Sequence, residues 1–569
     1  MGAGSSVNNK KYKPNNDKTS PTSPTVSPNN LEIREPESRF LHIVHFNDIY
    51  NLDIAYEEEP RGGARKFASQ MKKYKQELAF KGFFKPLVLF SGDFVGPSLM
   101  SSLTQGAHLI DALNAIGADY GTFGNHELDY GYESLKARLK GVDDDIFDQE
   151  VGFQDYETSE TQWISTNMTE VATGYPMGGS QVSRYALFEW GGEFGTALET
   201  EKPKSRAIKV GLLAVSENWL SQCSQLPPNT LAYEDYIESA KKTAKFLRQN
   251  GAEIVLAITH NRLSNDYKLM DAVPEIDLLL GGHDHFYKND LSKRIVKSGE
   301  EWRWLSKVEI ELKRGNPKPI VRLETVEIVS SMPDDIQITA LCDKFDRMCE
   351  QKFKRVIFRT AVDFNPMEEY VRYKESALCN WMCDICVEDY SLQDGLQTAD
   401  ICILLGYSFA GKAVIPAGDF TLANLFSILP LPLTMCVVKI TGQNVVDSLT
   451  EGCESLPEEC GAIHHVNAAL SYSIVVSSDG KSKPIVKDVL FKGQPIDLKK
   501  TYTVCLPSIM CTGKYGYLWN VKAERVVEEE FAPQLHDLIT MYCKRNWKSS
   551  VPNVYPANPS LGRIKIETI

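Results

Sequence analysis

The sequence predicts a layered α/β fold divided into more than one compact unit. Four apolar, β-branched runs in the first half of the chain end abruptly in Asp, Asn or His, and helical patterns lie between them. Continuous apolar runs of this length are typical of strands buried on both faces, and their alternation with helices favours a layered sheet. At about 100–200 residues per domain, a chain of 569 residues is long enough for more than one domain.

Each predicted strand is followed by side chains that can bind a metal ion. The four runs and the residues after them are 41–46 before Asn47 and Asp48, 86–92 before Asp93, 253–259 before His260, and 277–282 before His283, Asp284 and His285. Helical patterns at 61–79 and 109–120 follow the first two. Because ligands bind beyond the carboxyl ends of strands in such sheets, we expect these side chains to converge on one edge. Mixed nitrogen and oxygen donors suit Zn, Mn, Fe or similar ions, and this set is large enough for two of them.

Composition excludes several classes of protein. The formal charge of −13 and the pI near 5.4 disfavour nucleic acid as a partner. No apolar run reaches the length of about 18 residues that spans a bilayer, and the first 30 residues lack the apolar core of a secretory signal. Cys379, Cys383 and Cys386 recur at helical spacing, and we interpret them as small hydrophobic residues on a packed helix, since no further Cys or His follows at metal-binding spacing. Reduced thiols and the missing signal predict a cytoplasmic protein.

The first 38 residues predict a disordered tail with a lipid anchor. Pro, Asn, Ser and Thr dominate it, so little of it can be buried. Gly2, followed by three small residues and Ser6, matches the N-myristoylation pattern, although both residue types are common enough for a chance match. One acyl chain binds membranes weakly, and neighbouring lysines would add affinity for anionic lipid. We expect reversible, peripheral association with the inner membrane surface.

The strand-end motifs resemble those of a known family. Asn47-Asp48, Gly92-Asp93, the GNHE of 124–127, Thr259-His260 and the GHDH of 282–285 look like the five blocks of the calcineurin-like metallophosphoesterases. FNDIYNL, LFSGDFVGPSL and GTFGNHELDYG, with GDFTLANLFSILPL and YTVCLPSIMCTGKYGY in the second half, resemble its 5'-nucleotidase branch. The resemblance covers roughly 40–535. It implies a four-layer α/β-β/α sandwich and a second α/β domain for substrate, joined by a helix.

The resemblance also implies roles for single residues. Asp93 would bridge two divalent ions (Mn, Zn, Mg, Co or Fe), which activate a water to attack the phosphate of a small phosphomonoester. His126 would donate a hydrogen bond or proton to the leaving oxygen, and Asp129 would orient it. The remaining ligands would be Asp48 and His285 at the first ion and Asn125, His260 and His283 at the second.

The chain departs from the family at two places. Tyr50 stands where the first block usually has a ligand His, and a phenol is a weak ligand until it is deprotonated. We expect altered metal preference there rather than loss of activity. In the substrate domain, the positions that would bind a nucleoside lack the family's two Phe rings and its ribose-binding Asp, which favours a sugar-phosphate or phosphoglycerate substrate. The residues assigned to this pocket are Tyr407, Lys412, Leu431, Ile509, Lys514 and Tyr515.

The predicted organisation follows from these motifs. We expect a tail at 1–38, a metallophosphoesterase domain at 39–330, a linker helix at 331–355, a 5'-nucleotidase-like domain at 356–535, and a C-terminal helix and tail at 536–569. The pair His464 and His465 is expected on a surface loop, since adjacent residues of a strand point to opposite faces. Two other functions fit the motifs: a 5'-nucleotidase acting on nucleotides, and a catalytically weak, membrane-tethered binding protein. A cyclic-nucleotide phosphodiesterase would leave the second domain unexplained.

Overall fold

The structure is a computed structural model, and it describes residues 38–568 with gaps. The gaps are 54–57, 97, 143–155, 192–206, 221–222, 224–225, 228, 317, 392–398, 412, 430–432, 455, 457–462, 478–481, 512–521, 547–553 and 556–560. The predicted tail, with Gly2, and the predicted substrate residues Lys412, Leu431, Lys514 and Tyr515 lie outside the described residues. In the described part of the chain, no helix combines the length and the apolarity needed to cross a bilayer.

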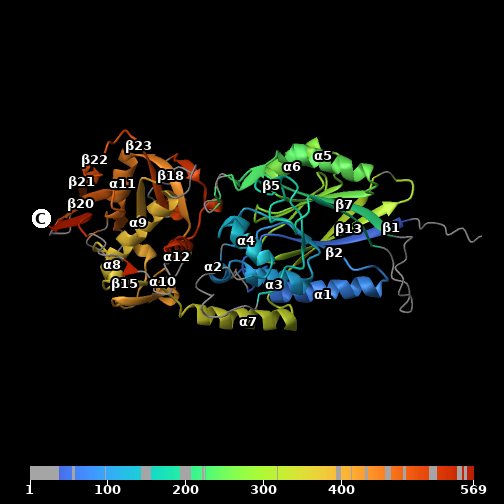
Figure 1. Ribbon diagram of the computed structural model, residues 1–569, viewed down its shortest axis with the longest axis horizontal. Coiled ribbons are helices and arrows are strands. Elements are labelled where there is room, and N and C mark those ends of the chain that lie inside the picture. Colours follow the sequence, from blue (N-terminus) through green and yellow to red (C-terminus); the bar gives the residue numbers. More distant parts are fainter. Residues whose placement is uncertain are drawn as a thin grey trace, which may run out of the picture.

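The N-terminal domain consists of two six-stranded sheets between two layers of helices (Figure 1). The first sheet is ordered β14 (Ile320–Glu327), β13 (Trp304–Lys313), β1 (Ser38–Phe46), β2 (Leu87–Phe90), β3 (Tyr120–Gly121) and β4 (Gln162–Trp163). The second is ordered β11 (Tyr287–Asp290), β12 (Ile295–Ser298), β10 (Leu278–Gly281), β9 (Ile254–His260), β7 (Ile208–Ser216) and β6 (Tyr185–Trp190). The four-layer prediction is confirmed.

Helices cover both outer faces of these sheets. The helices of this domain are α1 (Ala64–Phe80), α2 (Leu99–Thr104), α3 (Ala107–Ile116), α4 (Tyr132–Leu139), α5 (Tyr236–Gln249) and α6 (Leu263–Ala272). Along β1 the side chains alternate: Ile43 packs in the core between the sheets, and Val44 packs in the core beneath α1. This explains the continuous apolar runs, because each central strand is buried on both faces. The last two strands of this domain are antiparallel: β13 pairs with β1, and β14 forms the edge of the sheet.

A helix, α7 (Ile336–Lys352), leads to the C-terminal domain and lies along α1 and α3 (Figure 1). Asp335 begins it, accepting hydrogen bonds from the backbone N–H groups of Gln337 and Ile338. The linker helix predicted at 331–355 is therefore present, over Ile336–Lys352. Lys352, at its end, is buried and donates to the carbonyl oxygen of Leu103 at 2.7 Å, so that α7 is attached to the N-terminal domain along its length.

The C-terminal domain is built around a five-stranded sheet. Its strands are β19 (His464–Val466), β16 (Ile401–Leu405), β23 (Thr501–Pro507), β18 (Met435–Thr441) and β24 (Glu524–Val527), in that order. The smaller sheets hold β17 (Gly418–Thr421), β15 (Val356–Thr360) and β25 (Val554–Tyr555), and β22 (Gln494–Pro495), β21 (Ile485–Phe491), β20 (Leu470–Val476) and β26 (Ile564–Thr568). The helices are α8 (Glu368–Val371), α9 (Ala377–Ser391), α10 (Leu422–Ile428), α11 (Gly442–Gly452) and α12 (Leu535–Arg545).

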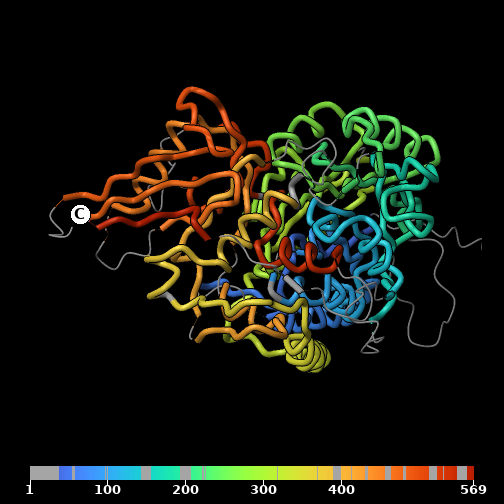
Figure 2. Tube along the Cα trace, turned by 60° about the vertical axis from the view of Figure 1, so that its left-hand side comes forward, coloured from blue at the N-terminus to red at the C-terminus, as the bar shows by residue number. Residues whose placement is uncertain are grey.

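Two details of this domain bear on the sequence predictions. The C-terminal helix is present as α12, and Figures 1 and 2 both show it on the side that faces the N-terminal domain.

The prediction for His464 and His465 is wrong, since both are buried on β19. Their side chains do point to opposite faces, but both faces are covered: the Nε2 atom of His465 lies 2.8 Å from the carbonyl oxygen of Val371.

Candidate metal centre

The candidate site lies where two strands of each sheet end. β1 leads to Asp48, β2 to Asp93, β9 ends at His260, and β10 leads to His283. The two sheets are joined here: the Nδ1 atom of His260 is 2.7 Å from the carbonyl oxygen of Ser91, and the backbone N–H of His283 donates to Asp48 Oδ2 at 2.9 Å. Strand ends far apart in the sequence therefore meet at one edge, as the sequence pattern predicts.

The backbone at these strand ends adopts uncommon conformations. Asp48, Asp93 and His283 have φ angles of 50°, 62° and 80°, in the left-handed region that non-glycine residues seldom occupy. Glycines make room for the side chains: a Cβ atom on Gly124 would collide with Asp93 Oδ1 and the His260 ring, and one on Gly282 would lie 2.9 Å from His260 Nδ1. Strained backbone and glycine contacts gathered at one point are typical of a functional site.

The structure brings the predicted ligands together. Ligand atoms of Asp93, His260 and His283 all lie within 4.8 Å of one another, and His260 Nε2 is 3.0 Å from Asp93 Oδ2. Beside them, His285 Nε2 is 3.5 Å from Asp48 Oδ1. Asp48, Asp93, Asn125, His260 and His283 are buried, whereas the His285 side chain is 47% exposed.

The charges of these groups fit bound cations. Burial raises the pKa of Asp48, whereas the charges of His260 and His126 hold the pKa of Asp93 well below its ordinary value in spite of burial. Burial and the charge of His260 lower the pKa of His283, so its ring is neutral and can bind a cation. Two buried carboxylates and several imidazoles are the donor set of a site for two divalent ions. Such ions supply an activated water and neutralise charge on a phosphoryl group.

Tyr50 lies inside this site. Its hydroxyl group can donate a hydrogen bond to Asp48 Oδ1 or to Asp93 Oδ2, each 3.2 Å away. The same hydroxyl oxygen lies 2.9 Å from His285 Nε2. Burial and the charges of Asp93 and Asp48 raise the pKa of this phenol well above its ordinary value. The phenol therefore lies between the carboxylates of Asp48 and Asp93 and holds the His285 ring close to Asp48.

His126 begins a short 3₁₀ turn, His126–Leu128, at the edge of the site. Its Nδ1 atom lies 2.8 Å from Asp129 Oδ2, and its backbone N–H donates to Asp93 Oδ1 at 3.0 Å. Despite burial, the carboxylates of Asp129 and Asp93 raise the pKa of His126 to about 10, so the ring carries a proton near neutral pH. Glu127 is buried next to His126, and its carboxylate accepts hydrogen bonds from the backbone N–H groups of Asp93, Phe94 and Gly124. Glu127 therefore fixes the loop that carries Asp93. In the sequence, only its place in the GNHE motif indicated a role at the site.

Lys297 is a supporting residue that the sequence analysis did not identify. It is fully buried, and its Nζ atom lies 3.0 Å from Asp266 Oδ2 and 2.8 Å from Asp284 Oδ2. It also donates to the carbonyl oxygens of Asn261 and Gly282, at 2.6 Å each, which belong to the loops that carry His260 and His283. Lys297 lies in the short strand β12, whose sequence is Ile-Val-Lys-Ser.

A cleft of about 1040 Å³ lies over the candidate metal centre, between the two domains. From the N-terminal domain it is lined by Tyr50, Asn51, Asp93, Asn125, His126, His283, Asp284, His285, Phe286, Glu300 and Glu301. From the C-terminal domain it is lined by Thr434, Arg525, Glu528, Glu529, Ala532 and Gln534. Charged and amide groups therefore face the metal centre from the second domain.

Two of the six residues predicted to bind substrate, Tyr407 and Ile509, lie in the described part of the chain. Neither is in the described lining of the cleft; both are partly buried and pack against buried residues of the C-terminal domain. Ser508, next to Ile509, donates to Glu529 Oε1 at 2.7 Å, so this segment contacts the cleft wall. Among the described residues, the C-terminal lining comes from Thr434 and from the segment 525–534, which the sequence did not indicate. For the other four residues the substrate pocket stays a prediction.

Comparison with known proteins gives consistent matches for both domains. Residues 41–287 match the family described as calcineurin-like phosphoesterase, and residues 356–522 match the 5'-nucleotidase C-terminal domain. The trifunctional nucleotide phosphoesterase protein YfkN of Bacillus subtilis (strain 168) is 23% identical over 84% of this chain, which spans only 32% of YfkN. The 5'-nucleotidase of Homo sapiens is 21% identical over 93% of this chain and 91% of its own length. NAD nucleotidase of Haemophilus influenzae has a similar fold, with a TM-score of 0.69, 17% identity, and coverage of 94% of this chain and all of that one.

Proposed function

Because this chain belongs to the 5'-nucleotidase family of calcineurin-like metallophosphoesterases, we propose that it is a dimetal phosphatase for small, sugar-like phosphomonoesters. The observation that carries the proposal is the meeting of Asp93, His260 and His283 beneath a cleft with a polar wall from the second domain. The two ions would be held by Asp93 together with Asp48 and His285 on one side and with Asn125, His260 and His283 on the other, and they would supply an activated water.

The residues beside the ions have separate roles in the proposed reaction. His126, charged near neutral pH, donates its Nε2 proton toward the leaving oxygen, and Asp129 holds the ring through Nδ1. The phosphate would bind at the cations that these side chains hold, so the alcohol part of the ester would extend into the cleft. Burial of the site lowers the water content around the reacting group and strengthens these electrostatic contacts.

The chemistry of the cleft wall supports a substrate rich in hydroxyl groups. Glu528, Glu529 and Gln534 offer oxygens that accept hydrogen bonds from hydroxyls, and Arg525 offers donors. Glu300 adds a further acidic group on the opposite wall, whereas burial raises the pKa of Glu301 to about 8 and leaves that side chain mostly uncharged near neutral pH. The carboxylates of Glu300, Glu528 and Glu529 repel a second anionic group, so of the two substrate types expected from the sequence we favour a sugar phosphate over a phosphoglycerate.

A nucleotide is the second candidate substrate. It is supported by the names of the relatives, a nucleotide phosphoesterase and a 5'-nucleotidase, and by one ring in the cleft, since Phe286 is 48% exposed and can stack on a base. Against it stands the polar character of the C-terminal wall.

A phosphate-release assay tests the proposal. Purified full-length chain is loaded with Mn²⁺, Zn²⁺, Mg²⁺ or Co²⁺ and given hexose phosphates, 3-phosphoglycerate, AMP and p-nitrophenyl phosphate, with Asp93→Asn as the inactive control. We expect the highest kcat/KM with a hexose phosphate. A higher kcat/KM with AMP would show that the protein is a nucleotidase. If no metal supports phosphate release, the proposal is wrong and the protein is better described as a binding protein.

A cleft variant tests the wall separately from the chemistry. Glu529→Gln removes a charged acceptor, and hydrogen bonds to charged groups contribute about 1.5–3 kcal/mol, so KM for the hexose phosphate should rise about tenfold or more. Turnover of p-nitrophenyl phosphate, which has no hydroxyl groups, should stay unchanged. Equal effects on both substrates would show that Glu529 does not contact the sugar.

Lipid anchoring and cytoplasmic location remain predictions about residues outside the described part of the chain. We propose N-myristoylation at Gly2 and weak association with the inner membrane surface. Gly2→Ala should release the protein from the membrane fraction of cells, and an unchanged distribution would contradict the anchor.

A further inference from the structure

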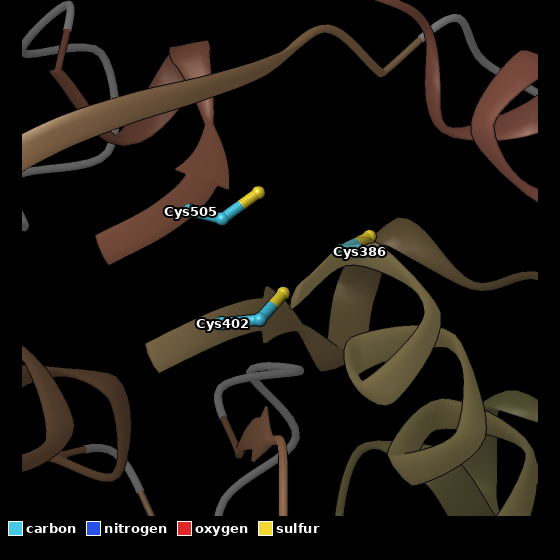
Figure 3. Close-up of side chains that lie close together, drawn as sticks. All are labelled: Cys386, Cys402 and Cys505. Atoms are coloured by element: carbon cyan, nitrogen blue, oxygen red, sulfur yellow. The ribbon is translucent and has the colours of Figure 1, made fainter. Parts of the chain in front are cut away.

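Four cysteines form a cluster in the C-terminal domain, far in sequence from the candidate metal centre. Cys383 and Cys386 lie on α9, Cys402 on β16 and Cys505 on β23, and all four are buried. We refer to these four residues as the thiol cluster. Figure 3 shows the side chains of Cys386, Cys402 and Cys505 close together, the first from the helix and the other two from neighbouring strands.

The fold places these sulfur atoms close together for a simple geometric reason. β16 and β23 are neighbouring parallel strands, and Cys402 pairs with Cys505 in their register. Helix α9 packs on β16, and the sulfur atoms of Cys386, Cys402 and Cys505 all lie within 4.8 Å of one another. Cys383, one helical turn before Cys386, lies beside Cys402. A helix and two strands thus bring three sulfur atoms together, with a fourth cysteine next to them.

These distances are close to those of a metal–thiolate site. In a tetrahedral zinc site the Zn–S distance is about 2.3 Å, which puts neighbouring sulfurs about 3.8 Å apart. The three sulfurs need to approach by about 1 Å or less from their separations here. The pair Cys383 and Cys386 has the C-x-x-C spacing common among zinc ligands.

A positive charge lies beside the cluster. The guanidinium group of Arg563, buried and paired with Asp384 at 2.7 Å, lies near Cys383. Packing as small hydrophobic residues, our interpretation from the sequence, explains burial but not why thiols from three separate elements converge.

We propose that the thiol cluster binds one Zn²⁺ ion, with Cys383, Cys386, Cys402 and Cys505 as its four ligands. With four protein ligands the site would be closed, as structural zinc sites are. The ion would attach α9 to the central sheet of the C-terminal domain, and its binding free energy would contribute to the folding of that domain. The proposal corrects the expectation that no further ligand lies near these cysteines: Cys402 and Cys505 approach through the fold, not through sequence spacing.

Metal analysis of the full-length chain tests this proposal. Asp93→Asn combined with His283→Asn disables the candidate dimetal site, so the metal that remains belongs elsewhere. In this background we expect one equivalent of zinc per chain. Replacement by Co²⁺ should give the near-ultraviolet absorption of cobalt–thiolate bonds and the intense visible bands of tetrahedral cobalt.

Cysteine variants in the same background locate the ion. Cys386→Ser with Cys402→Ser should lose the zinc equivalent and the cobalt–thiolate band. Cys543→Ser, a matched change at a buried cysteine of α12 whose pKa is shifted by burial alone, should lose neither. Less than a tenth of an equivalent of zinc, or no cobalt–thiolate band with all thiols intact, would overturn the proposal. The cobalt spectrum decides even when the double Ser variant fails to fold, because it needs no cysteine substitution.

Discussion

Replacement of Lys297 provides the sharpest test of how the candidate metal centre is held together. The ammonium group is buried among four oxygens: the carboxylates of Asp266 and Asp284 and the carbonyls of Asn261 and Gly282. Although burial opposes the charge, the two carboxylates raise the pKa of Lys297, so it remains an ammonium ion. Lys297→Met keeps most of the side-chain volume and removes only the charge and the donors.

The structure sets the size of the effect. Removing one partner of a buried ion pair costs about 3–5 kcal/mol, because the remaining charge is left uncompensated. Here Asp266 is fully buried and Asp284 is partly so, and we therefore expect a loss of about 3–5 kcal/mol in the free energy of unfolding. Lys293→Met is the matched control: its Nζ atom lies 3.3 Å from Asp271 Oδ1, both side chains are at least half exposed, and the loss should stay below about 1 kcal/mol.

Urea denaturation followed by tryptophan fluorescence measures this difference, and metal analysis of the folded variant measures its effect on the site. The loops that hold His260 and His283 should become misaligned, so that the folded Lys297→Met protein retains metal about 10–100-fold more weakly than the control. A variant that matches Lys293→Met in both stability and metal affinity would refute the view that Lys297 organises the metal centre.

Three further predictions concern residues around the site. His126→Ala should lower phosphate release by about 10²–10⁴-fold with bound metal unchanged, and an equal loss with p-nitrophenyl phosphate, whose leaving group needs no proton, would argue against the general-acid role. Glu127→Gln should weaken metal binding about 10–100-fold in a titration, and unchanged affinity would show that the Asp93 loop does not depend on it. Burial, with the charge of Asp129 nearby, raises the pKa of Asp537 to about 7, so its stabilising contribution is complete below about pH 4 and lost as pH rises through 7. Asp537→Asn should therefore melt at a higher temperature than the wild type above pH 7 and at a similar one near pH 4, whereas parallel melting curves would contradict this assignment.

The sequence predicted the metal-binding side chains because local patterns determine where they lie. Apolar runs that end in Asp or His predict buried parallel strands, and the carboxyl ends of such strands share an edge. This was sufficient for Asp48, Asp93, His260 and His283. Lys297 could not be predicted because it lies in a short strand, and its partners come from loops that only the fold brings next to it.

The cleft wall could not be predicted in the same way. Glu528 and Glu529 follow a short strand and belong to a stretch without strong periodicity, so only the docking of one domain on the other makes them line the cleft. The same limit applies to Cys402 and Cys505, which are about a hundred residues apart but occupy paired positions in neighbouring strands. Interactions that depend on strand register or on domain contacts are not visible in a single sequence.

The contacts of α7 indicate where the two domains can move relative to each other. The Nζ atom of Lys344 on α7 lies 3.0 Å from Asp111 Oδ2, and the Lys352 ammonium group donates to the carbonyl oxygen of Leu103. The helix should therefore move together with the N-terminal domain. From Phe353 onward the contacts change: its carbonyl oxygen accepts the N–H of Ala423 at 2.8 Å, in the C-terminal domain.

Across the cleft, the two domains meet in an exposed ion pair and in buried contacts of α12. Arg262 is 3.6 Å from Glu528, with both side chains more than a third exposed, and such a pair contributes less than about 1 kcal/mol. Asp537 on α12 is buried beside Ser102 and Tyr130 of the N-terminal domain. A rotation of the C-terminal domain would therefore have to release the contacts of α12 and would act at the residues just after Lys352. Because the wall formed by Glu528, Glu529 and Arg525 would move with that domain while all the candidate metal ligands stay in the other, opening the cleft would admit substrate without disturbing the metal centre.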